Sequence, residues 1–425
     1  MSAFDRIIGY ESQKAELKRY CDVIRNPEKY KALGVNIPTG ILLEGAPGLG
    51  KSTMAMCFME ECGCKSYTLR KNRPNGAFVD EIRATFDEAK QNAPAIVFLD
   101  DIDKYANEDD EHKNAEEYVA VQACIDDCKG SGVMVIATVN SVYSLPDSLI
   151  RAGRFDKTIT IGFPSYKDAP KILEYYLSSK KCIGDIDVEE ITMIAGGFSC
   201  AQMENIINEA GIEAGYEGHE LITQQDVIKA CLHEFFDAAE DPGYDDEEKM
   251  RLVAIHEAGH AVVSEYYTKR SVGLVSVFGC DGDGRGVTAY SRNIDGCSFR
   301  NKEQYIVRLL GGKAATEIVL GEPDIGCNED MQLAFGRIGE LIDNLCAYGF
   351  DSYSMPTQSS YVSENKDRMV AQELTKYYQT AKKILIDNRS FLDAIVDGLM
   401  EKNTLTCHEI QEIRDKVGMT VGMTA

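Results

Sequence analysis

The sequence lacks tryptophan, has only 6 histidines, and contains no apolar run long enough to cross a membrane. A membrane-spanning helix needs about 20 mostly apolar residues. The first six residues, Met1 to Arg6, also lack the apolar stretch of a secretory signal peptide. These absences predict a soluble, cytoplasmic protein with no membrane segment in this chain.

Paired cysteines are also missing, because the 14 cysteines include no Cys-x-x-Cys motif. They make up about 3% of the chain, well below the share in small disulfide scaffolds. Cys62 and Cys64 flank a single glycine, and Cys124 and Cys128 are one helical turn apart. Reduced thiols in an intracellular protein are therefore the favoured interpretation.

Basic residues are in the minority, with 45 Lys and Arg against 69 Asp and Glu, for a net charge of −24. Coating DNA or RNA requires a net basic surface, so this balance argues against a nucleic-acid partner. It also disfavours adsorption to an anionic membrane. A local basic pocket for a nucleotide remains compatible with it.

The chain has 425 residues, 44% of them apolar, which is enough for two to four domains with cores. Short apolar runs alternate with amphipathic stretches in residues 1–163, which predicts an α/β domain with a parallel sheet. Residues 95–99 are continuously apolar, as in a strand covered on both faces. The expected strands are residues 40–43, 66–69, 95–99, 133–138 and 158–161.

The rest of the sequence is predicted to be mainly helical. Residues 164–236 carry no strong strand signal, and residues 237–248 hold an acidic run with a Pro-Gly pair, typical of an exposed linker. Residues 249–425 form a second mainly helical domain. It should contain a hairpin around residues 274–290, turned at residues 279–284, and long helices around residues 368–386 and 391–401.

A phosphate-binding loop follows the first expected strand and opens a helix, with the pattern G-x-x-x-x-G-K-[ST]. Its backbone N–H groups and the helix N-terminus would hold phosphate oxygens. Lys51 would reach the outer phosphates and Ser52 would bind Mg²⁺. The residues expected to bind ATP and Mg²⁺ are Gly45, Ala46, Pro47, Gly48, Leu49, Gly50, Lys51, Ser52, Thr53 and Asp100.

Three further elements complete the predicted ATPase site. Asp100 ends an apolar strand, where it would hold Mg²⁺, and Asp101 would position or deprotonate the attacking water. Asn140 ends another strand and would orient water or the γ-phosphate. Arg151 and Arg154, three residues apart, would face a neighbouring subunit's nucleotide as arginine fingers.

The order of these parts resembles an AAA+ ATPase: phosphate loop, Asp-Asp strand, Asn-ended strand and Arg-x-x-Arg-Phe-Asp. The stretch Gly196–Ser199, followed by Ile206–Ala210, resembles the helical lid of that family. The resemblance implies an α/β nucleotide-binding domain over residues 1–163 and a lid over residues 164–236.

A metal motif, His256-Glu257-Ala-Gly-His260, lies within an apolar stretch predicted to be a helix. The i, i+4 spacing places both imidazoles on one face, where they can share a zinc ion. Glu257 lies beside them and would take a proton from water.

A catalytic zinc requires a third protein ligand. His408 is remote and is expected in a late polar turn, so a carboxylate is the better candidate. The spacing leaves four carboxylates open: Glu317, Asp324, Glu329 and Asp330.

An AAA+ module followed by this pentapeptide resembles the FtsH family of ATP-dependent zinc proteases. Residues 286–288 and 310–318 agree with it, and the resemblance runs from about residue 4 to about residue 416. In that family the Asp of a Gly-x-x-x-Asp segment is the third ligand, which corresponds to Asp330. The resemblance also implies zinc, ATP with Mg²⁺, protein or peptide substrates and a homo-hexameric ring.

The sequence departs from the family in three places. The membrane-spanning N-terminal region is missing, either naturally or by trimming. The family's Asp-Glu pair is Asp100-Asp101 here, so the second side chain is about 1.5 Å shorter. The aromatic triplet of the pore loop is Pro74-Asn75-Gly76 here.

Basic residues surround this triplet, and a single aromatic residue follows it. Phe78 lies two residues after the triplet and would take the place of the pore-loop aromatic that contacts substrate in the family. Arg70, Lys71 and Arg73 form a basic patch that would suit acidic substrates, unless it is an ordinary solvated loop.

The leading prediction is an ATP-driven zinc endopeptidase that unfolds and degrades proteins. The first alternative is a zinc peptidase whose ATPase is slow or only supports assembly. The second is a chaperone or scaffold with an inert zinc site.

Overall fold

The structure is a computed structural model that describes residues 2–35, 37–72, 75–106, 115–151, 153–236, 238, 247–278, 286–291, 298–322, 327–349 and 360–420. Most of the predicted linker, the predicted hairpin turn at residues 279–284, Arg73, Pro74 and Asp324 lie outside the described residues. The chain divides into two compact units. Unit 1 is residues 1–176 with 198–205, and unit 2 is residues 177–197 with 206–425.

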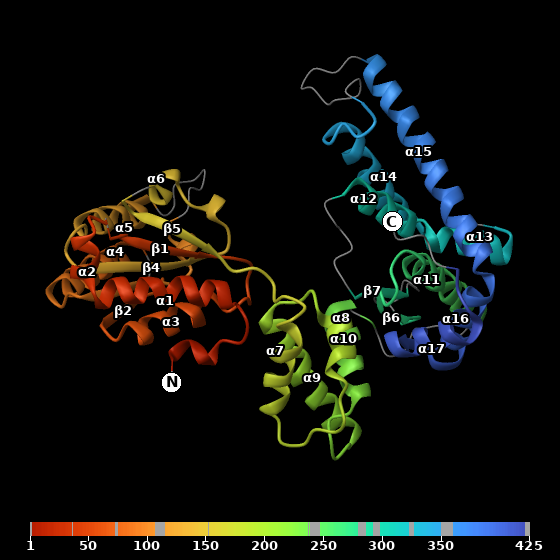
Figure 1. Cartoon of the computed structure of the whole chain (residues 1–425), viewed down its shortest axis with the longest axis horizontal. Coiled ribbons are helices and arrows are strands. Elements are labelled where there is room, and N and C mark those ends of the chain that lie inside the picture. The colour runs from red at the N-terminus through yellow and green to blue at the C-terminus, as the bar shows by residue number, and fades with distance from the viewer. Residues whose placement is uncertain are drawn as a thin grey trace. The chain divides into compact units, whose positions relative to one another are not determined.

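Unit 1 is built on a five-stranded sheet, with all strands parallel, in the order β2-β3-β4-β1-β5 (Figure 1). The strands are β1 (Gly40–Glu44), β2 (Lys65–Leu69), β3 (Ala95–Leu99), β4 (Val133–Val139) and β5 (Phe155–Thr160). The α/β prediction and its five strands are therefore confirmed. Parallel strands have their carboxyl ends at one edge, so the residues after β1, β3 and β4 meet there.

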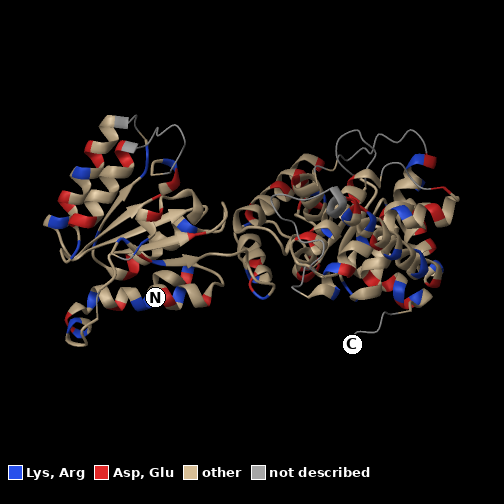
Figure 2. Cartoon of the chain, turned by 90° about the horizontal axis from the view of Figure 1, so that it is seen from above, with Lys and Arg blue, Asp and Glu red and all other residues tan. Residues whose placement is uncertain are grey.

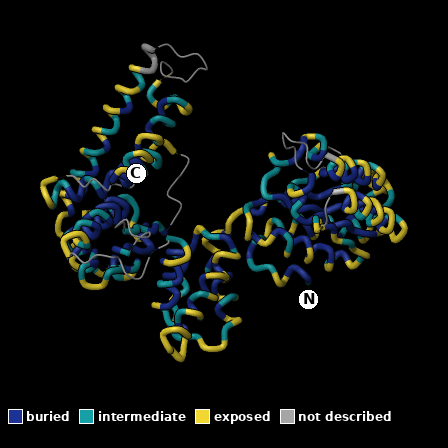
Figure 3. The backbone as a smooth tube through the Cα atoms, turned by 180° about the vertical axis from the view of Figure 1, so that it is seen from behind, coloured by how far each residue is buried: buried dark blue, intermediate teal, exposed yellow. Residues whose placement is uncertain are grey.

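Helices cover both faces of this sheet because successive side chains of a strand point to opposite faces. Ile96 and Phe98 of β3 pack in one core with α1 (Glu11–Arg25) and α3 (Lys51–Cys62). Val97 and Leu99 pack in the other core with α4 (Asn75–Gln91) and α5 (Ala115–Asp127). Strands β1, β3 and β4 are therefore buried along nearly their whole length and are drawn dark blue in Figure 3, whereas β2 and β5 are only partly buried. The other helices of residues 1–163 are α2 (Pro27–Ala32) and α6 (Asp147–Ile150), and α7 (Ala169–Ser178) begins the segment that was predicted as helical from residue 164.

The segment predicted as helical from residue 164 continues with α8 (Val188–Ala195), α9 (Cys200–Glu217) and α10 (Gln224–Phe236). Asp187 caps α8 by accepting a hydrogen bond from the Glu190 backbone N–H at 3.0 Å. Among the described residues of this segment, the one β-type pairing is an isolated parallel bridge between Ile183 and Ile222, and turns and loops join the helices.

The second part of unit 2 is mainly helical, as predicted, around a small antiparallel sheet. Its helices are α11 (Glu247–Tyr267), α12 (Phe299–Leu309), α13 (Gly311–Leu320), α14 (Asn328–Asp343), α15 (Ser360–Asp387), α16 (Arg389–Lys402) and α17 (Cys407–Val417). The sheet order is β7-β6-β8, from β6 (Val272–Ser276), β7 (Val287–Tyr290) and β8 (Thr404–Thr406).

Two details of this part differ from the sequence prediction. The predicted hairpin strands are present, but β8 was not predicted, because three residues carry too short a pattern. His408 does not lie in a polar turn. It lies in the first turn of α17, which Thr406 and Glu409 begin with a capping box.

Helix α11 is buried on nearly all sides and lies among α13, α16, α15, α12 and the strands β6 and β7 (Figure 1). A helix that is apolar around its whole circumference is a core helix. Its crossing with α13 is close, because a methyl group added at Gly259 would lie 2.4 Å from the Gly311 carbonyl oxygen. Two glycines therefore let the backbones of α11 and α13 touch.

The buried carboxylate of Glu265 connects the C-terminal end of α11 to neighbouring elements through hydrogen bonds. Glu265 is fully buried and accepts hydrogen bonds from the backbone N–H of Ser271 at 2.8 Å, from Gln411 at 2.8 Å and from Arg414 at 2.6 Å. Gln411 and Arg414 lie on α17, so one carboxylate joins α11, the start of β6 and the C-terminal helix. Both oxygens of this buried carboxylate thus accept hydrogen bonds.

Charged residues lie mainly on helices and loops, with acidic and basic residues interspersed, whereas the strands of the large sheet carry few of them (Figure 2). The twelve cysteines that the structure describes are free thiols. In the described part of the chain, no helix combines the length and hydrophobicity that crossing a bilayer requires.

Replacing Arg414 with methionine should lower the free energy of unfolding of unit 2 by about 3–5 kcal/mol, because it leaves the Glu265 charge buried without its cation. Arg389→Ala is the control, since Arg389 and Asp393 form a half-exposed pair on α16 worth about 0.3–0.5 kcal/mol. Urea unfolding of both variants measures this. Equal stability of the two variants would contradict the proposed importance of the buried pair.

Candidate nucleotide site and metal centre

The phosphate loop lies between β1 and α3, at the carboxyl edge of the large sheet. Gly45, Gly48 and Gly50 have φ angles of 159°, 77° and 85°, which favour glycine. A methyl group at Gly45 would also lie 2.2 Å from the Ile161 carbonyl oxygen. The glycines therefore shape a loop whose N–H groups, with the N-terminus of α3, can surround phosphate oxygens.

Lys51 begins α3 and is largely buried at this loop. Its Nζ donates to the carbonyl oxygens of Gly45 at 2.6 Å and Ala46 at 2.9 Å, and to Asn140 Oδ1 at 3.0 Å. Burial lowers the pKa of Lys51, and the carboxylates of Asp101, Asp103 and Asp100 offset this only in part. The side chain is thus held where outer phosphates would lie.

The predicted magnesium ligands meet across the sheet edge. Ser52 Oγ donates to Asp100 Oδ1 at 2.8 Å, and Thr138 Oγ1 donates to the same oxygen at 2.9 Å. Thr138, on β4, also accepts from the Asp101 backbone N–H at 2.8 Å. Carboxylate and hydroxyl oxygens, such as those of Asp100 and Ser52, are hard ligands of the kind that Mg²⁺ prefers. The sequence analysis missed Thr138.

Asp101 has a left-handed backbone with φ of 51°, and its Oδ2 lies 2.6 Å from Lys104 Nζ. Asn140, predicted to orient water or the γ-phosphate, is held by Asp103. The Asp103 Oδ2 accepts from the Asn140 side-chain N–H at 3.0 Å and from its backbone N–H at 3.3 Å. Sequence reasoning overlooked Asp103, although it follows the Asp-Asp pair by two residues.

The basic patch predicted for the pore loop is largely paired within unit 1. Arg70 Nε lies 3.7 Å from Asp100 Oδ2, and Lys71 Nζ lies 3.2 Å from the buried Glu117. Phe78 cannot replace the missing pore aromatic, because it is fully buried in α4 and packs edge-on against Tyr105 at 5.1 Å between ring centroids. The expected gripping role of Phe78 is therefore wrong.

The two candidate arginine fingers have different surroundings. Arg151 is exposed, whereas Arg154 is 4% exposed. Arg154 binds Asp126 of α5 with two nitrogens, at 2.7 Å and 3.1 Å, and donates to the Ser148 carbonyl oxygen. This pairing holds the pKa of Asp126 well below its usual range. Arg151 is thus exposed to solvent in this chain, whereas Arg154 is used in contacts within the chain.

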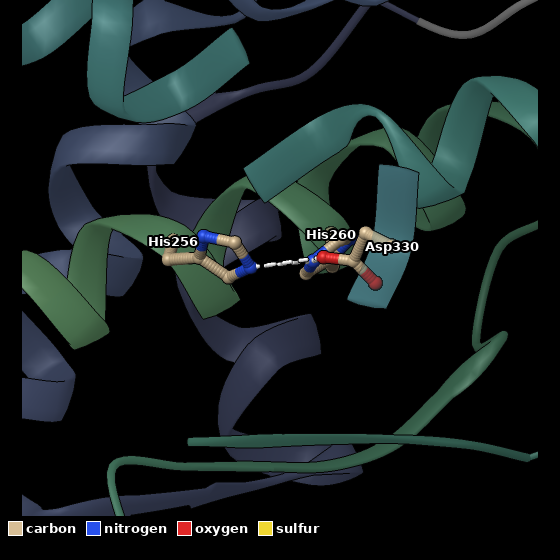
Figure 4. Close-up of side chains that lie close together, drawn as sticks. All are labelled: His256, His260 and Asp330. Carbon is tan, nitrogen blue, oxygen red and sulfur yellow. Dashed lines mark hydrogen bonds and ion pairs between the residues drawn. The ribbon is translucent and has the colours of Figure 1, made fainter. Parts of the chain in front are cut away.

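Three side chains from α11 and α14 converge in the second site (Figure 4). The Nε2 atoms of His256 and His260 are 3.0 Å apart, and each lies 3.1 Å from Asp330 Oδ2. Ligands bound at about 2.0–2.1 Å around a tetrahedral zinc lie about 3.3–3.4 Å apart. The triad therefore fits one zinc ion with only slight expansion.

Surrounding atoms fix the orientation of both rings. The His260 Nδ1 lies 2.8 Å from the Arg308 carbonyl oxygen. A carbonyl only accepts, so Nδ1 carries the proton and Nε2 is left to bind metal. On the other side, a methyl group at Gly312 would lie 2.4 Å from His256 Nε2. The Gly311-Gly312 pair thus serves the helix crossing and the metal site together.

The charges of the triad stabilise one another. Burial alone would raise the pKa of Asp330, but the charge of His260 and the hydrogen bonds from both rings hold it well below its usual range. Burial lowers the pKa of His260, yet Asp330 outweighs burial and the net shift is upward. A buried anion that stabilises positive charge at His260 is suited to a divalent cation.

The other candidate ligands are placed elsewhere or not described. Glu317 on α13 binds Lys382 at 2.6 Å and the Tyr378 hydroxyl, and Glu329 is exposed. Among the carboxylates that the structure describes, Asp330 is the one that meets both histidines. Glu257 is 7% exposed, and its Oε2 accepts from Thr288 Oγ1 at 2.6 Å.

A second group with metal-binding residue types occurs at the end of α9, formed by Glu217, His219 and Asp226. Here the two carboxylates lie at different ring nitrogens of His219. Asp226 accepts from the backbone N–H and the hydroxyl of Thr223, both at 2.7 Å. Lys229 pairs with Glu217. This group is explained as a cap of α10 and an ion-pair network.

Two family descriptions match the chain. Residues 41–163 match "ATPase family associated with various cellular activities (AAA)", and residues 244–413 match "Peptidase family M41". The matched ranges contain the phosphate loop and the His-Glu-x-x-His triad, respectively.

Named relatives align along nearly the whole chain. An ATP-dependent zinc metalloprotease FtsH of Lachnoclostridium phytofermentans is 30% identical over 96% of this chain and 74% of its own. The chloroplastic ATP-dependent zinc metalloprotease FTSH 6 of Arabidopsis thaliana is 29% identical over 96% of this chain. The chain spans 64% of that relative's length and 65% of a rice chloroplastic homologue.

The geometry of the two sites and the extent of these alignments lead to the same assignment. The chain belongs to the FtsH family of ATP-dependent zinc metalloproteases, with an AAA module followed by an M41 peptidase module.

Proposed function

We propose that the protein is an ATP-dependent zinc endopeptidase that unfolds and degrades protein substrates in a homo-hexameric ring. The observation that carries the proposal is the triad of His256, His260 and Asp330, with all three ligand atoms within 3.1 Å of one another. The proposed domains are residues 1–163 for nucleotide binding, 164–236 for the lid, 237–248 for the linker and 249–425 for the peptidase.

The proposed peptidase chemistry follows from the residues around the triad. Zinc bound there would polarise a peptide carbonyl and make a water molecule more acidic. Glu257 follows His256 directly and accepts the proton of the attacking water. The same carboxylic acid then returns the proton to the leaving amine, as general acid–base catalysis requires.

Strand β7 offers a place for the substrate chain. In the described residues β7 pairs with β6 alone and forms an edge of the three-stranded sheet. An extended peptide can add to such an edge through main-chain hydrogen bonds. Because Thr288 of β7 contacts Glu257, a peptide aligned on β7 would pass close to the proposed base.

The proposed ATPase cycle supplies force to the ring. Lys51, Ser52 and Asp100 would hold ATP and Mg²⁺, with Asp101 acting on the attacking water. Arg151 is the better candidate for a finger toward the neighbouring subunit, because Arg154 is already paired with Asp126. Such a finger makes hydrolysis depend on ring assembly.

A second candidate function is a zinc peptidase whose ATPase is slow and mainly supports assembly. The short Asp101 side chain is paired with Lys104, and Asn140 is bound by Asp103 rather than by Asp101. Both contacts occupy polar groups that the proposed hydrolysis step would use. The triad geometry speaks against the other alternative, an inert scaffold.

Degradation of a folded protein should require both ATP and zinc. Glu257→Gln should lower kcat for proteolysis by about 10²–10⁴-fold, the usual contribution of a general acid–base group, while ATP turnover persists. Gel assays with ATP, a non-hydrolysable analogue and a zinc chelator measure this. Equal cleavage under all three conditions would refute the proposal.

Lengthening the second acidic residue should speed ATP hydrolysis. Asp101→Glu should raise the ATPase kcat on the order of tenfold or more, since a 1 Å misplacement can cost about 100-fold. Phosphate release measures the rate, and Asp101→Asn is the matched loss-of-charge variant. An unchanged rate in Asp101→Glu would show that the shorter side chain is not limiting.

Mixed rings test whether Arg151 acts on a neighbour. Arg151→Ala alone should lower ATP turnover by about 10³-fold or more, as loss of an arginine finger does, whereas the exposed Arg19→Ala should have no effect. Lys51→Ala alone should also be inactive. Coexpression of the Arg151 and Lys51 variants should restore part of the ATPase activity, because some interfaces then hold both intact residues. No recovery in verified mixed rings would place Arg151 in its own site.

A further inference from the structure

We infer that Thr288 is a positioning residue for peptide hydrolysis, which fixes the carboxylate of Glu257 in the orientation that the reaction needs. The inference rests on the proposed peptidase function. It concerns a residue outside the triad and on a different element, the edge strand β7.

The contact is short and specific. Thr288 Oγ1 lies 2.6 Å from Glu257 Oε2 and 3.3 Å from the Glu257 backbone carbonyl oxygen. Its single proton is donated chiefly to the carboxylate, because O–H···O⁻ bonds of about 2.5–2.7 Å are the stronger, charge-assisted type. Among the described residues, no hydrogen bond engages the other oxygen, Oε1, so that oxygen is left for water.

The backbone around Thr288 makes the contact rigid. Thr288 pairs with Val275 in the antiparallel ladder of β6 and β7, and every residue of β6 is buried. Close by, a methyl group at Gly286 would lie 2.4 Å from Glu257 Cγ and 2.7 Å from the Ser276 carbonyl oxygen. The stem of Glu257 therefore lies against the bare backbone of Gly286, while its head is bound by Thr288.

Such a restraint has a chemical purpose. A glutamate has three rotatable side-chain torsions, and its carboxylate must keep one oxygen toward the attacking water. A residue that fixes the other oxygen raises the fraction of productive geometry without touching substrate or metal. The same strand is the proposed edge for the substrate, so one element would align both the peptide and the base.

Thr288→Val removes the hydroxyl at nearly constant shape, and Thr288→Ser keeps it. Valine should lower kcat for a quenched fluorescent peptide by about 10- to 100-fold, in the range expected for a small misplacement of a reacting group. KM, zinc content and the thermal unfolding temperature should stay unchanged. Serine should restore kcat to within about threefold of the parent. The control is Thr404→Val, which removes a hydroxyl from the other edge strand, where it contacts Ser276.

A double-mutant cycle separates positioning from a structural role. If Thr288 acts through Glu257, Thr288→Val should have no further effect on residual turnover in the Glu257→Gln protein. A peptide hydroxamate delivers its proton to a carboxylate base, so it should bind about tenfold more weakly to Thr288→Val than to the parent protein. It should bind equally to Glu257→Gln and to the double variant that also carries Thr288→Val.

Three results would overturn the inference: unchanged kcat in Thr288→Val, equal losses in both backgrounds, or loss of zinc or stability that accounts for the lost activity. A parent protein that shows no zinc-dependent peptidase activity would overturn the proposed function and this inference together. Peptidase activity in the parent with unchanged kcat in Thr288→Val would overturn the inference alone.

Discussion

The close contact between α11 and α13 is the constraint on which the peptidase module depends. Gly259 and Gly311 let the two backbones meet, and each would clash with a methyl group at the other. The close approach places Gly312 of α13 against the ring of His256. Helix α12 directly precedes α13 in the chain, and its Arg308 carbonyl oxygen fixes the ring of His260. A single crossing therefore sets the positions of both histidines, and α14 adds Asp330 from a third side.

The nucleotide site depends on a different constraint, the parallel alignment of β1, β3 and β4. Their carboxyl ends meet, so Lys51, Asp100 and Asn140 become neighbours although they are 40 to 89 residues apart in the chain. Thr138 joins two of these ends, because its hydroxyl serves both Asp100 and the Asp101 backbone. The sheet thus supplies the geometry, and short polar side chains at its edge supply the chemistry.

Sequence patterns predicted the elements better than the contacts between them. Strand β3 has the predicted bounds because its apolar run ends sharply at Pro94 and Asp100. The strand β8 was missed because Thr404–Thr406 is too short to show a period. Phe78 was misplaced because counting residues from a family motif does not reveal that its ring faces the core.

The same limit applies to the sites. Spacing alone indicated the His256–His260 pair, since helix geometry makes i and i+4 neighbours. It left the third ligand open among four carboxylates, because that choice depends on how α14 packs. The pairing of Arg154 with Asp126, and of Asn140 with Asp103, depends on tertiary contacts in the same way.

The pairings at the nucleotide site have a consequence for how ATP would act there. Lys51 donates to two loop carbonyls and to Asn140, Asp101 is paired with Lys104, and Asp100 accepts from Ser52. Phosphates and Mg²⁺ would compete with these partners, so part of their binding free energy is offset by the contacts that they break. Since Asn140 links Lys51 to Asp103, freeing Lys51 also alters the polar chain that ends behind the Asp-Asp pair. Nucleotide binding would therefore be coupled, through Asn140, to the residues proposed for hydrolysis.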